Sequence, residues 1–253
     1  FIGWRCEFDS GFGGFLPYED NKITVCGNRL YNCNSTMAGT SGCSSKYGNT
    51  TQLRSWTGVK CNDTNPFGVK YLVTELDLSG KSLSGSIPEQ LGLISALRFL
   101  DLSFNTLSNT VHPMINKFAN NAAVYLEKLR LESNSLSNTI PGSIGTITTL
   151  NSLGLHSNSL SGSIPSEIGS ALTKLSRIEM NNNAFTGNFP VSIFTLPRLI
   201  SIDVDTNSLT GLPTLTSQAS LLRVANFSNN QITTAILDIG QWGNNMPEAH
   251  TIY

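Results

Sequence analysis

A short ladder of apolar residues recurs along most of this chain of 253 residues. Each copy alternates apolar and other residues in the form L-x-x-L-x-L, and the copies begin at Val73, Leu97, Leu126, Leu150, Leu175, Leu199 and Leu222. Successive copies start 24, 29, 24, 25, 24 and 23 residues apart. Self-similarity at such a period predicts a solenoid, in which each coil packs against its two neighbours.

The alternation within each ladder is typical of a short β-strand, and the strands of successive coils are expected to form a parallel sheet. An asparagine follows each strand at a fixed place, with Lys81 as the first-copy exception: Asn105, Asn134, Asn158, Asn183, Asn207 and Asn230. Buried backbone groups need hydrogen-bond partners. We therefore expect these side-chain amides to bond neighbouring coils, and we interpret the ladder as core and scaffold.

The second half of several copies follows a more specific pattern. It reads L-S-G-S-I-P over residues 83–88 and 160–165, L-S-N-T-I-P over 136–141, and F-T-G-N-F-P over 185–190. This pattern resembles the plant-type subclass of the leucine-rich-repeat family, which occurs in receptor-kinase ectodomains, polygalacturonase-inhibiting proteins and many algal and protist surface proteins. The resemblance implies an α/β fold: a right-handed solenoid with a parallel β-sheet on its concave face and short strands and helical turns on its convex side.

All the cysteines lie near the N-terminus, at Cys6, Cys26, Cys33, Cys43 and Cys61. This clustering predicts a disulfide-bonded N-terminal cap over residues 1–72, with one cysteine unpaired or bound to another chain because the count is odd. The stretch 56–61 resembles the end of the family's cap. The family has a cysteine two residues before the tryptophan, whereas this chain has Arg54, so the resemblance leaves Cys43 as the nearest candidate partner of Cys61.

The remainder of the chain is expected to divide into two parts. Residues 73–232 hold the seven repeats, and the repeat from Leu97 carries five extra residues, which we expect to form a longer helical turn on the convex or lateral side. Residues 233–253 are predicted to form a partial repeat, at 235–239, and a C-terminal cap, because a solenoid must shield its last coil. The family's long opening helix and C-terminal cysteine pair are missing.

Four N-glycosylation sequons occur, at Asn34, Asn49, Asn62 and Asn226. Together with the cysteines they predict an extracellular or cell-surface protein. The chain begins at Phe1 without a signal-like segment, so we expect a mature or trimmed chain, and no apolar run approaches the roughly 18 residues of a membrane-spanning helix. Its 16 basic and 17 acidic residues nearly balance, which gives no electrostatic case for a nucleic-acid partner.

Catalysis finds little support in the sequence. His112, His156 and His250 lie in different regions, and no hydrolase, zinc-protease or nucleotide-binding motif is present. Glu132 and His156 occupy matching positions on consecutive strands, about 4.8 Å apart, and we interpret them as a cross-strand polar pair because no nucleophile completes a triad. The cysteines include no CxxC pair with a nearby histidine, which argues against zinc. We predict a protein that is not an enzyme and holds no metal or cofactor.

The outward residues of the concave strands are the candidate binding surface. Acidic residues predominate among them, at Glu75, Asp77, Asp101, Glu132, Glu179, Asp203 and Asp205. The other candidates are the bases Lys128, Arg130 and Arg177, the exposed aromatics Phe99 and Phe104, and His156. Like charges in register are mildly destabilising. We therefore hypothesise that the face takes a basic or polyhydroxylated ligand, chiefly through its aspartates; hydration of the carboxylates, and cover of the phenylalanines by the cap or a glycan, are the alternatives.

Two functions from different classes are consistent with these features. The first is an extracellular recognition or adhesion module whose concave face binds a protein, peptide or glycan. The second is a structural glycoprotein that assembles with copies of itself into a coat or filament, because the two different ends of a solenoid allow propagating contacts. Ice or crystal-surface binding by the regular serine and threonine rows is a third, weaker idea.

Overall fold

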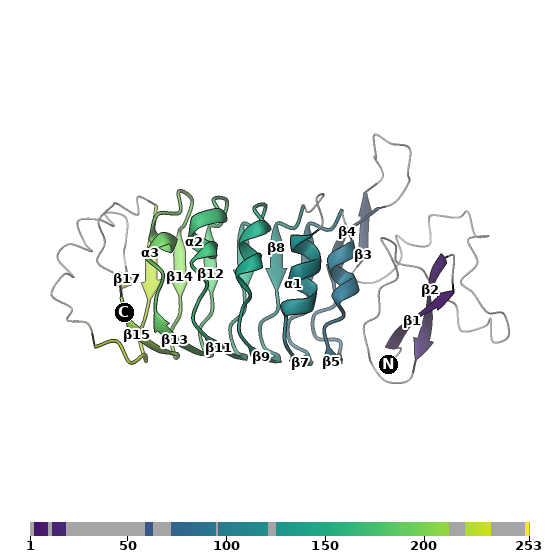
Figure 1. Cartoon of the computed structure of the whole chain (residues 1–253), viewed down its shortest axis with the longest axis horizontal. Helices are drawn as coiled ribbons and strands as arrows, with labels where there is room; N and C mark the ends of the chain where they lie inside the picture. The colour runs from purple at the N-terminus through teal and green to yellow at the C-terminus, as the bar shows by residue number, and fades with distance from the viewer. Residues whose placement is uncertain are drawn as a thin grey trace.

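The protein is a stack of similar coils, shown side by side in Figure 1. The computed structural model describes residues 73–94, 96–120, 125–212 and 221–233 with their side chains, and outside these ranges the backbone of several strands. Each coil contributes a first strand, and each except the last described coil also contributes a second strand. Most coils contain a short helical turn as well. The predicted solenoid with parallel sheets and short helices is confirmed.

The first strands of the coils form one nine-stranded sheet, which is the concave sheet. Its strands, in spatial order, are β17 (Thr251–Ile252), β16 (Val224–Asn226), β14 (Ser201–Asp203), β12 (Arg177–Glu179), β10 (Ser152–Gly154), β8 (Lys128–Arg130), β6 (Phe99–Asp101), β4 (Leu72–Asp77) and β3 (Val59–Asn62). Neighbours pair in parallel from β4 to β17, whereas β3 pairs with β4 in the antiparallel sense. This antiparallel strand therefore covers the edge at which the sheet begins.

The second strands form a six-stranded sheet along one flank of the solenoid (Figure 1). Its members are β5 (Ser84–Ser86), β7 (Thr106–Asn109), β9 (Ser135–Asn138), β11 (Ser159–Gly162), β13 (Ala184–Asn188) and β15 (Ser208–Gly211). Between β13 and β15 the register shifts at Gly187 and Asn188. The sequence explains the shift, because the coil of β15 reads L-T-G-L-P, one residue shorter than the F-T-G-N-F-P of the coil before it.

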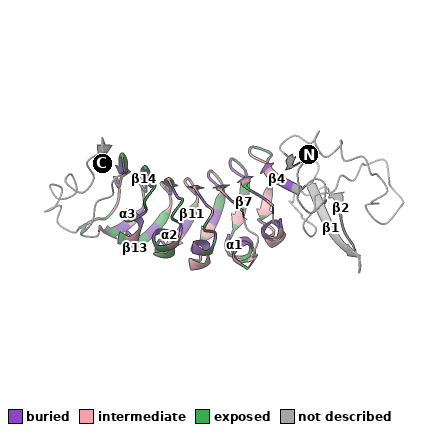
Figure 2. Cartoon of the chain, turned by 90° about the horizontal axis from the view of Figure 1, so that it is seen from above, coloured by how far each residue is buried: buried purple, intermediate pink, exposed green. Residues whose placement is uncertain are grey.

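Short helical turns line the remaining side of the solenoid (Figure 2). They are the 3-10 helices η2 (Glu89–Leu93) and η3 (Gly142–Thr146) and the α-helices α1 (His112–Ala119), α2 (Glu167–Ala171) and α3 (Val191–Phe194). The longest, α1, contains part of the five-residue insertion, as the repeat spacing predicts, and it buries Met114, Ile115 and Phe118. These turns pack closely, since a Cβ added to Gly169 of α2 would lie 2.2 Å from backbone atoms of Ser192 and Ile193.

The asparagine of each coil bonds the coil before it. The Oδ1 atom of Asn105 accepts hydrogen bonds from the backbone N–H groups of Lys81 and Leu83, at 3.0 and 2.9 Å. Its Nδ2 atom donates to the carbonyl of Leu78 in the previous coil and to two carbonyls of its own turn. Asn134, Asn158, Asn183, Asn207 and Asn230 repeat the pattern. The predicted scaffold role of this position is thereby confirmed.

Several predictions concern parts of the chain outside the described residues. The side chains of all five cysteines belong there, so the disulfide-bonded cap over residues 1–72 stays a prediction. Within that segment the backbone shows an antiparallel hairpin of β1 (Gly3–Asp9) and β2 (Phe12–Tyr18). The partial repeat at 235–239 also lies outside the described residues, and the strand that follows β16 in the sheet is β17. The boundaries at 72 and 232 are not tested by these observations.

Candidate functional site on the concave face

The outward residues of the concave strands stand in columns that cross the coils. The first column contains Glu75, Phe99, Lys128, Ser152, Arg177, Ser201 and Val224. The second column contains Asp77, Asp101, Arg130, Gly154, Glu179, Asp203 and Asn226. Backbone hydrogen bonds align a third column just beyond the strands, with Ser79, Ser103, Glu132, His156, Asn181, Asp205 and Ser228. The structure thus brings the sequence-predicted residues of these columns onto one face.

At both ends of the sheet, the second-column side chain is held by the residue two positions later. The Oδ1 atom of Asp77 accepts hydrogen bonds from the N–H and hydroxyl of Ser79, at 3.0 and 2.6 Å. Asp101 binds Ser103 in the same way, at 2.9 and 2.5 Å, and Asn226 binds the N–H and hydroxyl of Ser228. These carboxylates and this amide therefore stabilise their own strand ends. As a result, fewer acidic side chains are free to bind a ligand than the list of acidic residues from the sequence suggests.

Two aspartates of the second column differ in their electrostatics. The hydrogen bond from the Ser79 hydroxyl lowers the pKa of Asp77 and outweighs the opposite effect of partial burial. Burial raises the pKa of Asp203, and the charge of the neighbouring Asp205 acts in the same direction. The N–H of Asp205 donates to Oδ1 of Asp203 at 3.2 Å, as the N–H of Ser79 does to Asp77, but an aspartate at this position has no hydroxyl to donate a second bond. The same column position thus favours ionisation in one coil and opposes it in another.

The middle of the face is built around Arg130. Its Nε and Nη2 atoms lie 2.7 and 2.6 Å from Oε1 of Glu132, and its Nη1 lies 3.5 Å from Oδ2 of Asp101. Partial burial opposes the charge of Arg130, but the bond to Glu132 and the nearby carboxylates raise its pKa overall. The side chain of Glu132 is only 1% exposed, whereas that of Arg130 is 47% exposed. The guanidinium is therefore fixed by two carboxylates and is not free to bind an anion.

Gly154 makes this arrangement possible. A Cβ atom on Gly154 would lie 2.6 Å from Oε2 of Glu132, so the carboxylate occupies space that any other residue would fill. The Oε2 atom of Glu132 and the Nδ1 atom of His156 are buried and have no hydrogen-bond partner among the described residues. Glu132 and His156 are neighbours in the third column, as the sequence predicts, but no hydrogen bond joins their side chains. Sequence reasoning missed the role of Gly154, although a glycine in a column of polar residues is a visible signal.

Three charged side chains around β10 have no ion pair or side-chain hydrogen bond among the described residues: Lys128, Arg177 and Glu179. Lys128 and Arg177 are exposed and stand in the first column on either side of Ser152. β10 itself presents only the small residues Ser152 and Gly154. The result is a shallow strip over β10 that is bordered by two unpaired cations and by Glu179, whose charge also acts on Arg130.

The remaining predicted site residues have separate positions. Phe99 is half-buried in the first column, and Phe104 is exposed in the turn after β6. Asp205 accepts hydrogen bonds from the hydroxyl of Thr206 and from Nδ2 of Asn229, at 3.0 and 2.9 Å. Asn226, a predicted glycosylation site, lies on β16 of the concave sheet. Glycosylation there stays a prediction, and the side chains of Asn34, Asn49 and Asn62 lie outside the described residues.

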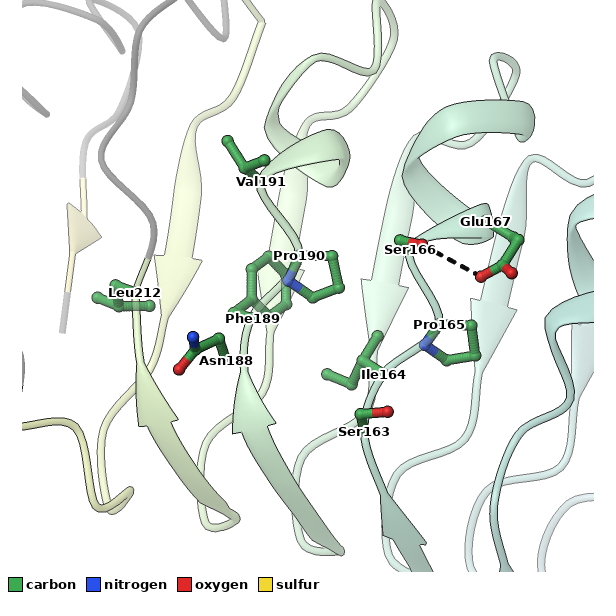
Figure 3. Close-up of a pocket in the computed structure, with 10 residues that line it drawn as sticks. All are labelled: Ser163, Ile164, Pro165, Ser166, Glu167, Asn188, Phe189, Pro190, Val191 and Leu212. Carbon is green, nitrogen blue, oxygen red and sulfur yellow. Dashed lines mark hydrogen bonds between the residues drawn. The ribbon is translucent and has the colours of Figure 1, made fainter.

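A pocket of about 540 Å³ lies away from these columns, between the ends of β11 and β13 and the starts of α2 and α3 (Figure 3). Pro165, Pro190 and Glu167 line it, and Ser166 donates a hydrogen bond to Glu167 at 3.3 Å. Its far wall is Leu212, the last described residue before 213–220. The pocket contains none of the sequence-predicted site residues, and we assign it no function.

Two further classes of site are not found in the described part of the chain. Within those ranges, no group of three or more histidine, cysteine, aspartate or glutamate residues is arranged to hold a metal ion. The helices described there are all too short or too polar to cross a membrane.

Comparison with known proteins agrees with this architecture. The family model described as Leucine Rich Repeat matches residues 125–147 and 149–171. Phytosulfokine receptor 1 of Arabidopsis thaliana is 37% identical over 94 residues, which are 37% of this chain and 8% of that receptor. The chain therefore spans less than a tenth of this relative's length.

Solved structures share the fold at moderate sequence identity. The leucine-rich-repeat ectodomain of the receptor kinase SOBIR1 from Arabidopsis thaliana matches with a TM-score of 0.56 and 30% identity, over 64% of this chain and 88% of that one. The plant peptide hormone receptor RGFR1, in complex with RGF2, matches with a TM-score of 0.52 and 27% identity, over 70% of this chain and 34% of that one. The chain belongs to the leucine-rich-repeat family, in the plant type that forms the ectodomains of receptor-like kinases and receptor-like proteins.

Proposed function

We propose that this chain is a non-catalytic extracellular recognition module that binds a protein or peptide segment over β8, β10 and β12. The observation that carries the proposal is the shallow strip of Ser152 and Gly154, bordered by Lys128 and Arg177, which are unpaired among the described residues, and by Glu179. Elsewhere on the face, Asp77, Asp101 and Asn226 are held by their own turns.

The spacing of the unpaired charges fits an extended segment. Lys128 and Arg177 are separated by one intervening strand, so their backbones lie about 10 Å apart. Charges that no neighbour neutralises increase the rate and the specificity of association with a complementary ligand. Because both cations stand in the same column, the ligand carries an acidic group there, and Glu179 favours a donor or basic group beside it. This proposal replaces the basic or polyhydroxylated ligand that the count of acidic residues suggested.

The relatives support a peptide over a glycan and an extracellular location. RGFR1 is described as a peptide hormone receptor in complex with RGF2, and phytosulfokine receptor 1 is also named as a receptor. The match is to the ectodomain type of these proteins, and it covers a small part of the longer relatives. By this analogy the chain acts outside the cell, alone or as part of a longer receptor.

A selection experiment with random peptides tests the proposal while the natural ligand is unidentified. Random peptides displayed on phage are selected on the folded wild-type chain, and the affinity of the enriched peptides is measured for the double variant Lys128→Ser/Arg177→Ser. We expect the affinity to fall by at least about tenfold and the enriched peptides to contain acidic residues.

The matched control removes the same charge elsewhere. Lys174 and Arg198 are also exposed, have no ion pair among the described residues, and lie outside the three columns. Lys174→Ser/Arg198→Ser should leave the affinity unchanged. An equal loss in both variants, or no peptide that depends on the concave pair, contradicts the proposal. Self-assembly into a coat or filament stays a prediction from the sequence, which light scattering on the native, unreduced protein tests.

A further inference from the structure

One turn position has a left-handed backbone in every described coil. It follows the first strand and is occupied by Gly80, Phe104, Ser133, Ser157, Asn182, Thr206 and Asn229, with φ values between 51° and 61°. Glycine or a residue with a short polar side chain fills it in all these coils except that of Phe104. The repetition shows that the turn, and not the residue, dictates the conformation.

Phenylalanine is unfavourable at such a position. In the left-handed region the Cβ atom crowds the backbone, and only glycine and, to a lesser degree, asparagine and aspartate adopt it readily. Asparagine occupies the same turn at Asn182 and Asn229, so the fold accepts the favoured residue there. Phe104 is therefore retained against the local conformational preference, and such outliers cluster at functional sites.

Among the described residues, no aromatic or cationic neighbour of the Phe104 ring offsets the cost of its left-handed backbone. Phe104 is 60% exposed, the largest value among the exposed large hydrophobic residues of the described ranges. Its ring stacks on no other aromatic ring or cation there, in contrast to Phe189, Phe194 and Phe227, which form a buried cluster. The ring is thus both conformationally disfavoured and uncovered.

We propose that Phe104 is an anchor that an apolar side chain of the bound ligand covers. This inference rests on the function proposed above and adds the second contact of the same peptide. The N–H of Phe104 donates to the carbonyl of Glu132 at 3.0 Å, so its turn adjoins the end of β8, the strand that carries Lys128. Exposed aromatic side chains near the centre of an interface contribute disproportionately to binding.

The positions also constrain the ligand's sequence. Across the strands, Lys128 lies one strand beyond β6 and Arg177 three strands beyond it, which is about 5 and 14 Å. Phe104 also lies five residues beyond Phe99 of the first column, which adds up to about 16 Å along the strand direction. An extended peptide advances about 3.3 Å per residue, so the ligand should place an aliphatic, proline or aromatic residue within about seven residues of its acidic residue.

The test uses two measurements on Phe104→Asn that are expected to change in opposite directions. All chains are produced in the bacterial periplasm, which does not N-glycosylate them, because Phe104→Asn creates an Asn-Asn-Thr sequon with Asn105 and Thr106. Relief of the left-handed strain should raise the midpoint of urea unfolding with an unchanged slope. The peptides selected on the wild-type chain should bind the variant at least about tenfold more weakly. Phe104→Leu, which keeps an apolar side chain in the same turn, should lose less affinity than Phe104→Asn and should not gain its stability. Val191→Thr removes another exposed apolar group, on α3, and should leave the affinity unchanged.

The other possible results contradict the anchor, the concave site or the peptide ligand. A lower urea midpoint for Phe104→Asn means that the ring stabilises the fold, which overturns the anchor. Unchanged peptide affinity also overturns it. Loss of affinity in Phe104→Asn but not in Lys128→Ser/Arg177→Ser contradicts the proposed concave site and leaves the anchor standing. Binding of an oligosaccharide on a glycan array, abolished by Phe104→Asn, assigns the ring to a sugar and contradicts the peptide.

Discussion

The asparagine position and the second concave column recur once per coil but differ in how strictly they repeat. The asparagine position holds the same residue in all repeats except the first, and each of these side chains bonds the backbone of the coil before it. The second column changes from aspartate to arginine, glycine, glutamate and asparagine. An interior position meets the same hydrogen-bonding need in every coil, whereas an outward position is free to change. Variation along the column therefore points to the strands that recognise a partner.

The largest expected effect comes from a substitution at the asparagine position, which does not vary after the first repeat. Asn105→Ala leaves the buried N–H group of Leu83, the partly buried N–H group of Lys81 and several carbonyls without their partner. Unsatisfied buried groups cost about 1 to 3 kcal/mol each, so we expect a loss of about 3 kcal/mol in the free energy of unfolding. Urea denaturation measures the loss. Peptide affinity at Lys128 and Arg177 should stay unchanged while the chain is folded; a loss below about 1 kcal/mol would contradict the scaffold role.

An intermediate effect is expected at Gly154, a position of the variable second column that also has a structural role. Gly154→Ala places a Cβ 2.6 Å from Oε2 of Glu132 and forces the carboxylate out of its space. Overpacking of this kind costs about 1 to 3 kcal/mol. In the double variant Gly154→Ala/Glu132→Ala the two losses should not add, because the clash is removed. Ser152→Ala on the same strand is the control and should be nearly neutral. Strictly additive losses of stability would show that Glu132 does not depend on the space left by Gly154.

The smallest effects separate two aspartates of the second column by their pH dependence. The lowered pKa of Asp77 gives stability that is present above the pKa of the unfolded chain, about 3.9, and is lost as pH falls through the folded value. The raised pKa of Asp203 has the opposite sign. Its contribution is present at low pH and is lost as pH rises through the folded value.

Two neutral variants expose this difference, both produced in the bacterial periplasm because Asp77→Asn creates an Asn-Leu-Ser sequon with Ser79. Asp203→Asn should stabilise the protein slightly near neutral pH, and Asp77→Asn should be neutral or slightly destabilising, both within about 0.5 kcal/mol. Relative to the wild type, the gain of Asp203→Asn should shrink on acidification. Urea midpoints measured between neutral pH and about pH 4 follow both variants. If the urea midpoints of the two variants changed with pH in parallel, the opposite pKa shifts of Asp77 and Asp203 would be refuted.

The sequence was sufficient for the elements that depend on periodicity. The ladder predicted the strands and the register of the outward columns, the asparagines predicted the cross-coil bonds, and the extra residues near 111–125 predicted α1. The state of each candidate side chain was not predictable in the same way. Asp101 and Glu132 look like free acids when the column residues are taken from the sequence, but the fold commits both to Arg130.

What the sequence determined by itself is the repeating frame, because each coil is specified by local alternation and by one hydrogen-bonding residue at a fixed interval. What only the tertiary structure decided is which side chains remain available on that frame. Side chains of the columns meet across coils more than twenty residues apart, where rotamers, turn geometry and the absence of one Cβ at Gly154 select the partners. For this reason Arg130 is occupied while Lys128 and Arg177 are unpaired, and the strain at Phe104 becomes visible only as a backbone angle.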